Sequence, residues 1–128
     1  MNRSAKTKAE AARRDILKTV KESAVIKEVQ AVIDATGLQV QRLNTGAFAT
    51  GTGNNRRFVR SAKKGTLDFE GYDNRGRFCA IECKRPVGGR VSPEQAARIE
   101  DINPKGGIAF TARSGLEALN LLEINNCI

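Results

Sequence analysis

The chain has 128 residues, a length that suits a single domain with one hydrophobic core. Lysine and arginine outnumber aspartate and glutamate by 22 to 14, and the resulting formal charge of +8 predicts a polyanionic partner. The lack of histidine excludes a Ser-His-Asp triad, an imidazole base and a histidine-ligated zinc site, and the lack of tryptophan, with a single tyrosine, argues against a base-stacking surface.

The N-terminal region is expected to contain one long helix followed by a strand. Residues 1–13 are polar and basic without an apolar face, so we expect a flexible basic tail or the frayed start of a helix. From Arg14 to Ala35, apolar residues recur at steps of three and four, which predicts a single helix that Gly37 ends. Residues 38–43 alternate between apolar and polar, which predicts a short strand.

The middle of the chain is expected to hold a loop, a basic stretch and a β-hairpin. Residues 44–55 are rich in glycine, threonine and asparagine and lack periodicity, which predicts a loop. Residues 56–64 are strongly basic. The stretches 67–72 and 77–84 flank the turn sequence 73–76, and this pattern predicts two hairpin strands.

The C-terminal region is expected to alternate between helix and strand. Ser92, followed by a proline and then by Gln95, has the pattern of a capped helix start. Residues 108–112 form a short apolar run typical of a strand, and Ser114 is placed to cap a last helix. We therefore expect an α/β fold, a single domain over residues 14–128 with a central mixed sheet flanked by helices.

The cysteines and the hydropathy favour a cytoplasmic protein. Three cysteines without regular spacing do not suggest a disulfide framework, so Cys79, Cys83 and Cys127 are expected to be free thiols in a reducing compartment. No apolar run approaches the length of a membrane span, and the basic N-terminal residues lack the apolar region of a signal peptide. We expect the cytoplasm of a bacterium or of a phage-infected host.

The strand predicted at 78–84 is strongly apolar but carries charge at its end. Because side chains alternate along a strand, Glu82 and Lys84 share one face, with Cys83 on the other. Asp68 lies on the preceding strand, and a hairpin can bring its carboxylate close to that of Glu82. Buried charges are costly unless they are paired or bind a metal, so this position indicates a site.

Two carboxylates beside a lysine have the composition of a phosphodiesterase centre. Oxygen ligands without histidine or cysteine side chains favour Mg²⁺ or Mn²⁺, which could polarise a phosphate and acidify a water molecule. Lys84 could orient or deprotonate that water, or stabilise negative charge on the phosphate. The alternative is structural: Asp68 could be a solvated turn residue, with Glu82 and Lys84 forming a surface ion pair.

Further motifs surround these residues over most of the chain. They are Arg42-x-Asn44-Thr45-Gly46, Arg57-Phe58-Val59-Arg60, Gly65-x-x-Asp68, Gly76-Arg77-Phe78, Ala80-Ile81-Glu82-x-Lys84-Arg85-Pro86, Ser92-Pro93-Glu94-Gln95 and Gly106-Gly107. The pattern Asp68-x13-Glu82-x-Lys84 resembles the PD-(D/E)XK nuclease superfamily, and with the other motifs the chain resembles its VRR-NUC family of replication and repair nucleases, in the stand-alone form of phages. The resemblance covers about residues 22–120 and implies a restriction-endonuclease-like core.

The resemblance implies a set of metal ligands. Asp68 and Glu82 would bind Mg²⁺ or Mn²⁺ through their carboxylates, and Cys83 through its backbone carbonyl. The family also has an acidic residue on its first helix, which Glu22 matches by ungapped alignment and for which Glu28 is the second candidate. Glu22 could instead be an exposed helix charge.

The resemblance also implies two further catalytic residues. Lys84 would be the catalytic lysine, and Gln95 matches the glutamine at the start of the helix after the core. Gln95 could equally complete a capping box with Ser92. Leu67 stands where the superfamily name has proline, and Cys83 where a residue such as valine is usual, although only the carbonyl of Cys83 would take part.

Seven basic residues and one asparagine near the proposed centre are expected to contact DNA, mainly through phosphates, which align a strand without reading its sequence. These DNA-binding candidates are Arg42, Asn44, Arg57, Arg60, Lys63, Lys64, Arg85 and Arg90. The expected activity is Mg²⁺- or Mn²⁺-dependent endonuclease cleavage of branched DNA such as four-way junctions, by a homodimer that a helicase or replication protein could assist. The alternatives are a flap-type or restriction-type nuclease of the same superfamily, and a basic nucleic-acid-binding module without catalysis.

Overall fold

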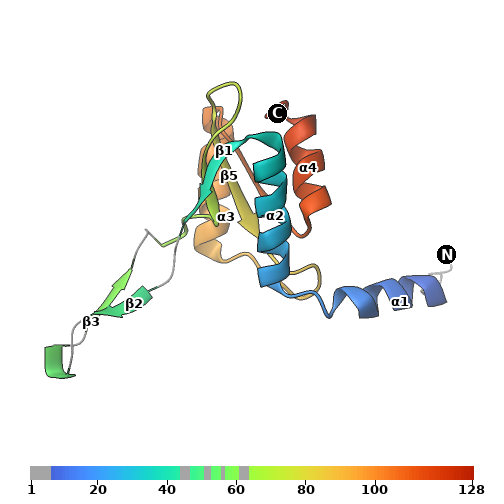
Figure 1. Ribbon diagram of the computed structural model, residues 1–128, viewed down its shortest axis with the longest axis horizontal. Coiled ribbons are helices and arrows are strands. Elements are labelled where there is room, and N and C mark those ends of the chain that lie inside the picture. The colour runs from blue at the N-terminus through green and yellow to red at the C-terminus, as the bar shows by residue number, and fades with distance from the viewer. Residues whose placement is uncertain (1–6, 44–46, 51–52, 56, 61–63) are drawn as a thin grey trace.

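The computed structural model describes residues 7–43, 47–50, 53–55, 57–60 and 64–128 (Figure 1). Its elements in chain order are α1 (Lys8–Leu17), α2 (Glu22–Thr36), β1 (Gln39–Arg42), β2 (Ala47–Thr50), the 3-10 turn η1 (Gly53–Asn55), β3 (Arg57–Arg60), β4 (Phe69–Tyr72), β5 (Phe78–Cys83), α3 (Pro93–Ile102), the 3-10 turn η2 (Asn103–Lys105), β6 (Ile108–Ala112) and α4 (Gly115–Ile124).

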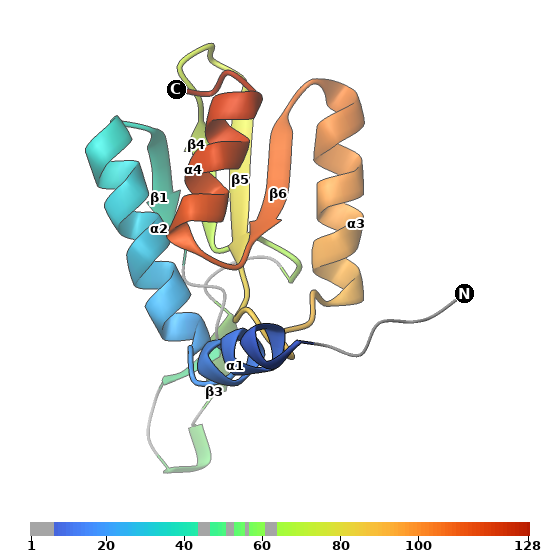
Figure 2. The same ribbon diagram turned by 90° about the vertical axis from the view of Figure 1, so that its right-hand side faces the viewer.

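A four-stranded mixed sheet in the order β1-β4-β5-β6 forms the centre of the molecule (Figure 2). β4 is antiparallel to both of its neighbours, β1 and β5, whereas β6 runs parallel to β5. The parallel pair is possible because α3 carries the chain back across the sheet between β5 and β6. The expected α/β architecture with a mixed sheet flanked by helices is confirmed.

Helices cover the two faces of the sheet unequally. α2 and α4 pack on one face, where they bury the larger apolar cluster, which includes Val25, Val29, Phe69, Ile81 and Leu122. On the other face, α3 covers a smaller cluster of Leu67, Ala80, Ile102 and Ala109. The face under α3 is therefore the thinner one, in the sense that its core is smaller. Asp68 and Glu82 lie on this face, because they alternate with Phe69 and Ile81 of the larger cluster.

The helix expected over 14–35 is two helices, so that prediction is wrong. α1 begins at Lys8, where Thr7 and a glutamate form a capping box. Residues 18–21 are not helical and separate α1 from α2. The apolar pattern misled because Ile16 and Leu17 continue the stripe of α2 yet remain 66% and 43% exposed. Residues up to 13 were expected to be a tail or a frayed helix, and those from Lys8 are helical.

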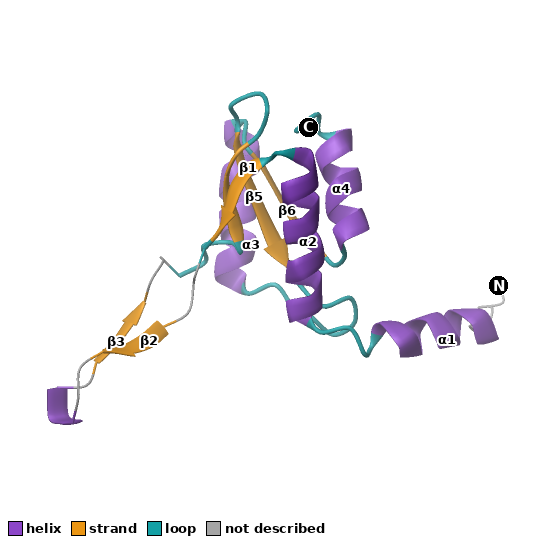
Figure 3. Cartoon of the chain, in the orientation of Figure 1, coloured by secondary structure: helices purple, strands orange, loops and turns teal. Residues whose placement is uncertain are grey.

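The loop expected over 44–55 and the basic stretch after it contain a second small sheet. β2 and β3 pair antiparallel with each other, and Figure 3 shows this ribbon projecting from the main sheet. The sequence signal was weak because Ala47–Thr50 lacks a clear apolar face. The hairpin lies between β1 and β4, which are themselves neighbours in the main sheet.

The expected C-terminal elements are confirmed. Asp73 closes the β4–β5 turn by accepting hydrogen bonds from the backbone N–H groups of Arg75 and Arg77, both at 2.9 Å. Ser92 and Gln95 form the capping box, and Ser114 caps α4 by accepting from a backbone N–H. These signals are local in sequence, so they did not depend on the tertiary fold.

The three cysteines, Cys79, Cys83 and Cys127, are free and buried, as expected. Burial raises the pKa of the Cys79 thiol to about 12 and also raises that of Cys83, so both thiols are held in the neutral form. Among the described residues, none of the helices combines the length and the apolar composition that a membrane crossing requires.

Candidate active site

The hairpin register brings Asp68 and Glu82 together at one end of the sheet. Phe69 pairs with Ile81, so one step further Asp68 lies opposite Glu82. Side chains at directly opposed positions lie close together, and two like charges there are unfavourable. Asp68 is nevertheless 9% exposed and Glu82 only 1%, so the fold keeps two adjacent carboxylates away from water.

Backbone hydrogen bonds fix both carboxylates. Oδ2 of Asp68 accepts from the N–H of Cys83 at 2.8 Å, and Oε1 of Glu82 accepts from the N–H of Asp68 at 3.2 Å. Each carboxylate is therefore fixed in position, and each also ties its own segment of chain to the neighbouring one. The second oxygen of each group faces a cation: Nη2 of Arg42 lies 3.8 Å from Oδ1 of Asp68, and Nζ of Lys84 lies 3.0 Å from Oε2 of Glu82.

Lys84 connects the carboxylate pair to α2. Its Nζ lies 3.7 Å from Oε1 of Glu22, the first residue of that helix. Negative and positive side chains therefore alternate from Glu22 through Lys84 to Glu82. Asp68 lies next to Glu82, and Arg42 lies on the far side of Asp68. Glu28 is placed elsewhere, since its Oε1 accepts from the N–H of Gly115 at the start of α4, at 3.0 Å. Of the two acidic candidates on α2, the fold brings Glu22 to the site.

The electrostatic balance of this cluster is unfavourable for a second negative charge. Burial, and then the charge of Asp68, raise the pKa of Glu82 to about 7, although Lys84 opposes the rise. Burial alone would lower the pKa of Lys84, but its hydrogen bond to Glu82 and the surrounding carboxylates raise it. Lys84 is therefore protonated at neutral pH, whereas the carboxyl group of Glu82 gains or loses its proton near pH 7.

The donor set fits a hard divalent cation. One oxygen of Asp68 and one of Glu82 are free of backbone hydrogen bonds and face side-chain cations that a metal ion could displace. The described residues contain no group of three or more acidic or cysteine side chains that could hold a metal. Mg²⁺ commonly takes only one or two protein carboxylates and completes its shell with water and substrate phosphate, so a pair of carboxylates is enough to hold such an ion.

A groove of about 700 Å³ opens beside Lys84. The junction of α1 and α2 lines one side of it, and residues 85–90 line the other. Five of its lining side chains are cationic and one, Glu22, is acidic. The cationic residues are Lys18, Lys21, Lys84, Arg85 and Arg90. This excess of positive charge favours an anionic group beside Lys84.

Arg113 holds the loop that carries two of these cations. Its Nη1 donates to the backbone oxygens of Arg85 and Gly89, at 2.9 and 3.0 Å. A Cβ at Gly89 would lie only 2.8 Å from the Arg85 oxygen, so the tight turn requires glycine there. The sequence did not indicate the contributions of Lys18, Lys21 or Arg113, because the first two lie in an unexpected helix break and Arg113 acts through backbone atoms.

The other predicted site residues lie around this centre or outside the described part of the chain. Gln95 completes the capping box with Ser92, and among the described residues its amide makes no hydrogen bond to the carboxylate pair. Lys64 pairs with Glu94 at 3.0 Å. Arg57 and Arg60 lie on β3, although their side chains are outside the description. Asn44 and Lys63 lie outside the described residues.

Comparison of the chain with protein-family models, with curated proteins and with solved structures gave no match in any of the three cases. The geometry of the site and the motifs in the sequence are therefore the features that indicate what the chain does.

Proposed function

We propose that this chain is a metal-dependent DNA endonuclease of the PD-(D/E)XK type, similar to the VRR-NUC family. The observation that carries the proposal is the buried pair of Asp68 and Glu82 with Lys84 beside it, at the edge of a basic groove. A simple structural ion pair would not need a second carboxylate. The strain that this carboxylate adds, expressed in the raised pKa of Glu82, is typical of functional sites.

The topology supports a restriction-endonuclease-like core. The order α2-β1-β4-β5-α3-β6-α4 gives three antiparallel strands, a crossover helix and a parallel fourth strand. The carboxylates lie at the end of the central hairpin, where β5 leaves the sheet toward the groove. This placement holds the carboxylates rigidly on the sheet, and Lys84 is the member of the site on β5 that reaches the groove.

The proposed chemistry is hydrolysis of a phosphodiester. Bound Mg²⁺ or Mn²⁺, held by Asp68, Glu82 and the Cys83 carbonyl, would supply Lewis-acid polarisation of the phosphate and a more acidic water. Asp68 and Glu82 are held rigidly by backbone N–H groups, so they are preorganised as ligands. Lys84 is protonated and can donate to a phosphate oxygen as negative charge develops. Water adds to phosphorus, the P–O3′ bond breaks, and the products are a 5′-phosphate and a 3′-hydroxyl.

The groove supports DNA as the substrate and cleavage that depends on DNA structure. Lys18, Lys21, Arg85 and Arg90 are suited to phosphate contacts, which position a strand without reading base identity. A domain of this size offers little further surface for a long recognition sequence. We therefore favour structure-selective cleavage, with branched DNA such as a four-way junction as the substrate class.

The test is cleavage of labelled single-strand, duplex, flap and four-way-junction DNA with Mg²⁺, Mn²⁺ or EDTA. The wild type should cut only with a divalent ion. Asp68→Asn and Glu82→Gln should bind DNA but fail to cut, and Lys84→Met should cut roughly 100-fold more slowly because one charge-stabilising donor is lost.

Lys27→Met provides a matched control, since Lys27 is an exposed lysine of α2 that does not line the groove. It should cut like the wild type. Cleavage that survives Asp68→Asn or Glu82→Gln would contradict the site. Salt-sensitive binding without cleavage of any substrate would instead favour a basic nucleic-acid-binding module.

A further inference from the structure

Two aromatic side chains lie exposed and side by side on the thinner face of the sheet. Tyr72 on β4 pairs directly with Phe78 on β5, and the two are 54% and 41% exposed. Phe78 has the same alternation as Ala80, which packs under α3, so both rings lie on the α3 side of the sheet. α3 reaches this end through Arg98, Asp101 and Ile102, which line one side of a pocket beside Phe78 and leave both rings partly open to solvent.

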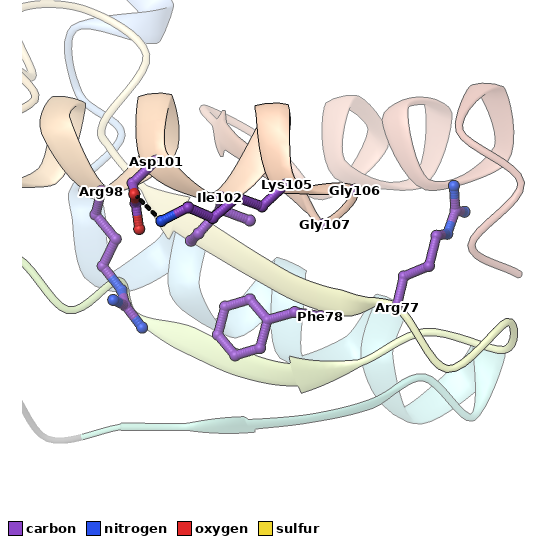
Figure 4. A pocket seen from close by; sticks show the side chains of 8 residues that line it. All are labelled: Arg77, Phe78, Arg98, Asp101, Ile102, Lys105, Gly106 and Gly107. Carbon is purple, nitrogen blue, oxygen red and sulfur yellow. Dashed lines mark hydrogen bonds and ion pairs between the residues drawn. The ribbon is translucent and has the colours of Figure 1, made fainter.

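Each ring forms part of the wall of its own shallow pocket. Phe78 lines a pocket of about 370 Å³ between β5 and the end of α3, where Figure 4 shows its ring facing Ile102 with Arg98 to one side. Tyr72 lines a pocket of about 320 Å³ together with Gln39, Gln41 and Glu70. Both volumes are in the range of small-ligand pockets.

The polar groups around the rings suit the edges of nucleobases, because the cations Arg98 and Lys105 are already paired with Glu70 and Asp101. The Arg98 guanidinium lies 5.7 Å from the centre of the Phe78 ring and is fixed by two hydrogen bonds to Glu70, at 2.6 and 2.8 Å. Gln39 and Gln41 are exposed, so their amides can bond to base edges. The exposed Lys105 lies at the rim of the Phe78 pocket.

The aromatic pair has a fixed relation to the carboxylate site. Phe78 and Glu82 lie on the same side of β5, four residues apart, which is about 13 Å along the strand. That distance corresponds to roughly four stacked nucleotides at 3.4 Å each. Glu70, opposite Ala80, and its partner Arg98 lie between the rings and Glu82 on this face, so a strand whose bases rest on the rings would pass this ion pair before its backbone reached the carboxylates.

We propose that Tyr72 and Phe78 form a stacking surface for two unpaired bases, and that the preferred substrate carries a single-stranded segment a few nucleotides from the cleaved phosphate. Within a duplex, adjacent base pairs stack on one another and cover their planar faces, whereas unpaired bases can stack on aromatic side chains. The scarcity of aromatic residues in the sequence pointed the other way, but two well-placed rings are sufficient for two bases. The substrate part of this inference rests on the proposed nuclease function, whereas the binding part does not.

The chain provides its own probe, because Tyr72 is its single tyrosine and it has no tryptophan. In EDTA and at low salt, a 12-nucleotide oligothymidylate should quench the tyrosine emission, after correction with free thymidine of equal absorbance. An abasic 12-mer of equal charge should bind more weakly and leave the emission unchanged. A fully paired duplex should also leave the emission unchanged.

Variants then measure each ring through the anisotropy of labelled oligothymidylate. Phe78→Ala and Tyr72→Ala should each weaken binding by roughly 5- to 150-fold, the range expected for the loss of one stacked base, while Tyr72→Phe should retain it. Ile124→Ala is the control, since Ile124 is an apolar residue of α4 that is 73% exposed. Phe78→Leu keeps the apolar bulk without the aromatic plane and serves if the alanine variant unfolds.

The proposal is overturned if the abasic oligomer binds as tightly as oligothymidylate, or if Phe78→Leu and Tyr72→Ala bind like the wild type. Because binding is measured without metal and without cleavage, the two proposals fail separately. Quenching without metal-dependent cutting would refute the nuclease alone, and cutting without quenching would refute the stacking surface alone.

Discussion

Glu82→Gln should stabilise the metal-free protein above neutral pH. In the folded chain, burial and the charge of Asp68 raise the pKa of Glu82 from 4.5 to about 7. The difference of about 2.5 corresponds to roughly 3 kcal/mol, at about 1.36 kcal/mol for each pKa unit. The favourable contact with Lys84 is already contained in this net value. An uncharged amide of the same shape avoids the cost of ionisation, so the gain should be up to about 3 kcal/mol.

The dependence on pH follows from where the proton is held. Between pH 4.5 and about 7 the folded protein keeps the proton on Glu82, whereas the unfolded chain has released it, so the stability of the wild type falls as the pH rises through this range. The variant has no such group. Its advantage should therefore be absent near pH 4.5, grow through the range and remain constant above pH 7.

The measurement is the free energy of unfolding in urea with EDTA, at pH 4.5, 6 and 8, for the wild type, Glu82→Gln and the exposed control Glu123→Gln. Added Mn²⁺ should stabilise the wild type by mass action and the variant much less. The reasoning is refuted if Glu82→Gln is less stable than the wild type at pH 8, or if the difference between them is the same at every pH.

Three further substitutions test parts of the framework. Asp73→Ala should lower the free energy of unfolding, measured in urea, by about 3 kcal/mol, because two backbone N–H groups and Arg77 lose a buried acceptor. Burial would raise the pKa of Asp73, but these hydrogen bonds hold it below 3.8. The stabilising contribution of Asp73 should therefore be present above pH 3.8 and be lost as the pH falls further. Arg113→Ala should weaken duplex binding several-fold by anisotropy and cost about 1 kcal/mol of stability, because its bonds to the groove loop are lost; unchanged affinity would show that the loop holds its shape without it. Gln95→Glu keeps the capping box with Ser92, so its melting temperature should be unchanged while cleavage falls; full cleavage would leave Gln95 as a cap alone.

The local parts of the fold could be predicted from the sequence because short-range geometry determines them. Gly37 ends α2 with a φ of 72°, which favours glycine, and the Ser92–Gln95 box spans three residues. The alternation of side chains along β5 likewise predicts, without any tertiary contact, that Glu82 and Lys84 lie on one side of the strand. In each case the residues that carry the signal are the residues that form the contact.

The remaining features depend on contacts between distant segments. The break between α1 and α2 could not be seen, because Ile16 and Leu17 are apolar but face solvent. Glu22 and Glu28 are equivalent as helix residues, and only the position of β5 against α2 brings Glu22 to Lys84. The groove joins two segments more than 60 residues apart, so no sequence window contains it.

The hairpin between β1 and β4 gives this architecture a natural point of variation. The N–H of Leu43 donates to the carbonyl of Asp68 at 2.8 Å. The hydrogen bonding between β1 and β4 therefore continues up to the point where the chain leaves the main sheet and returns to it. Lengthening a connection of this kind is inexpensive, because each doubling of a flexible loop costs only about 0.6 kcal/mol of closure entropy. The segment between Leu43 and Gly65 could therefore be exchanged in evolution, or by design, for one of different length and charge. A library of such exchanges would alter what approaches the site while leaving Asp68 and Glu82 in the same register.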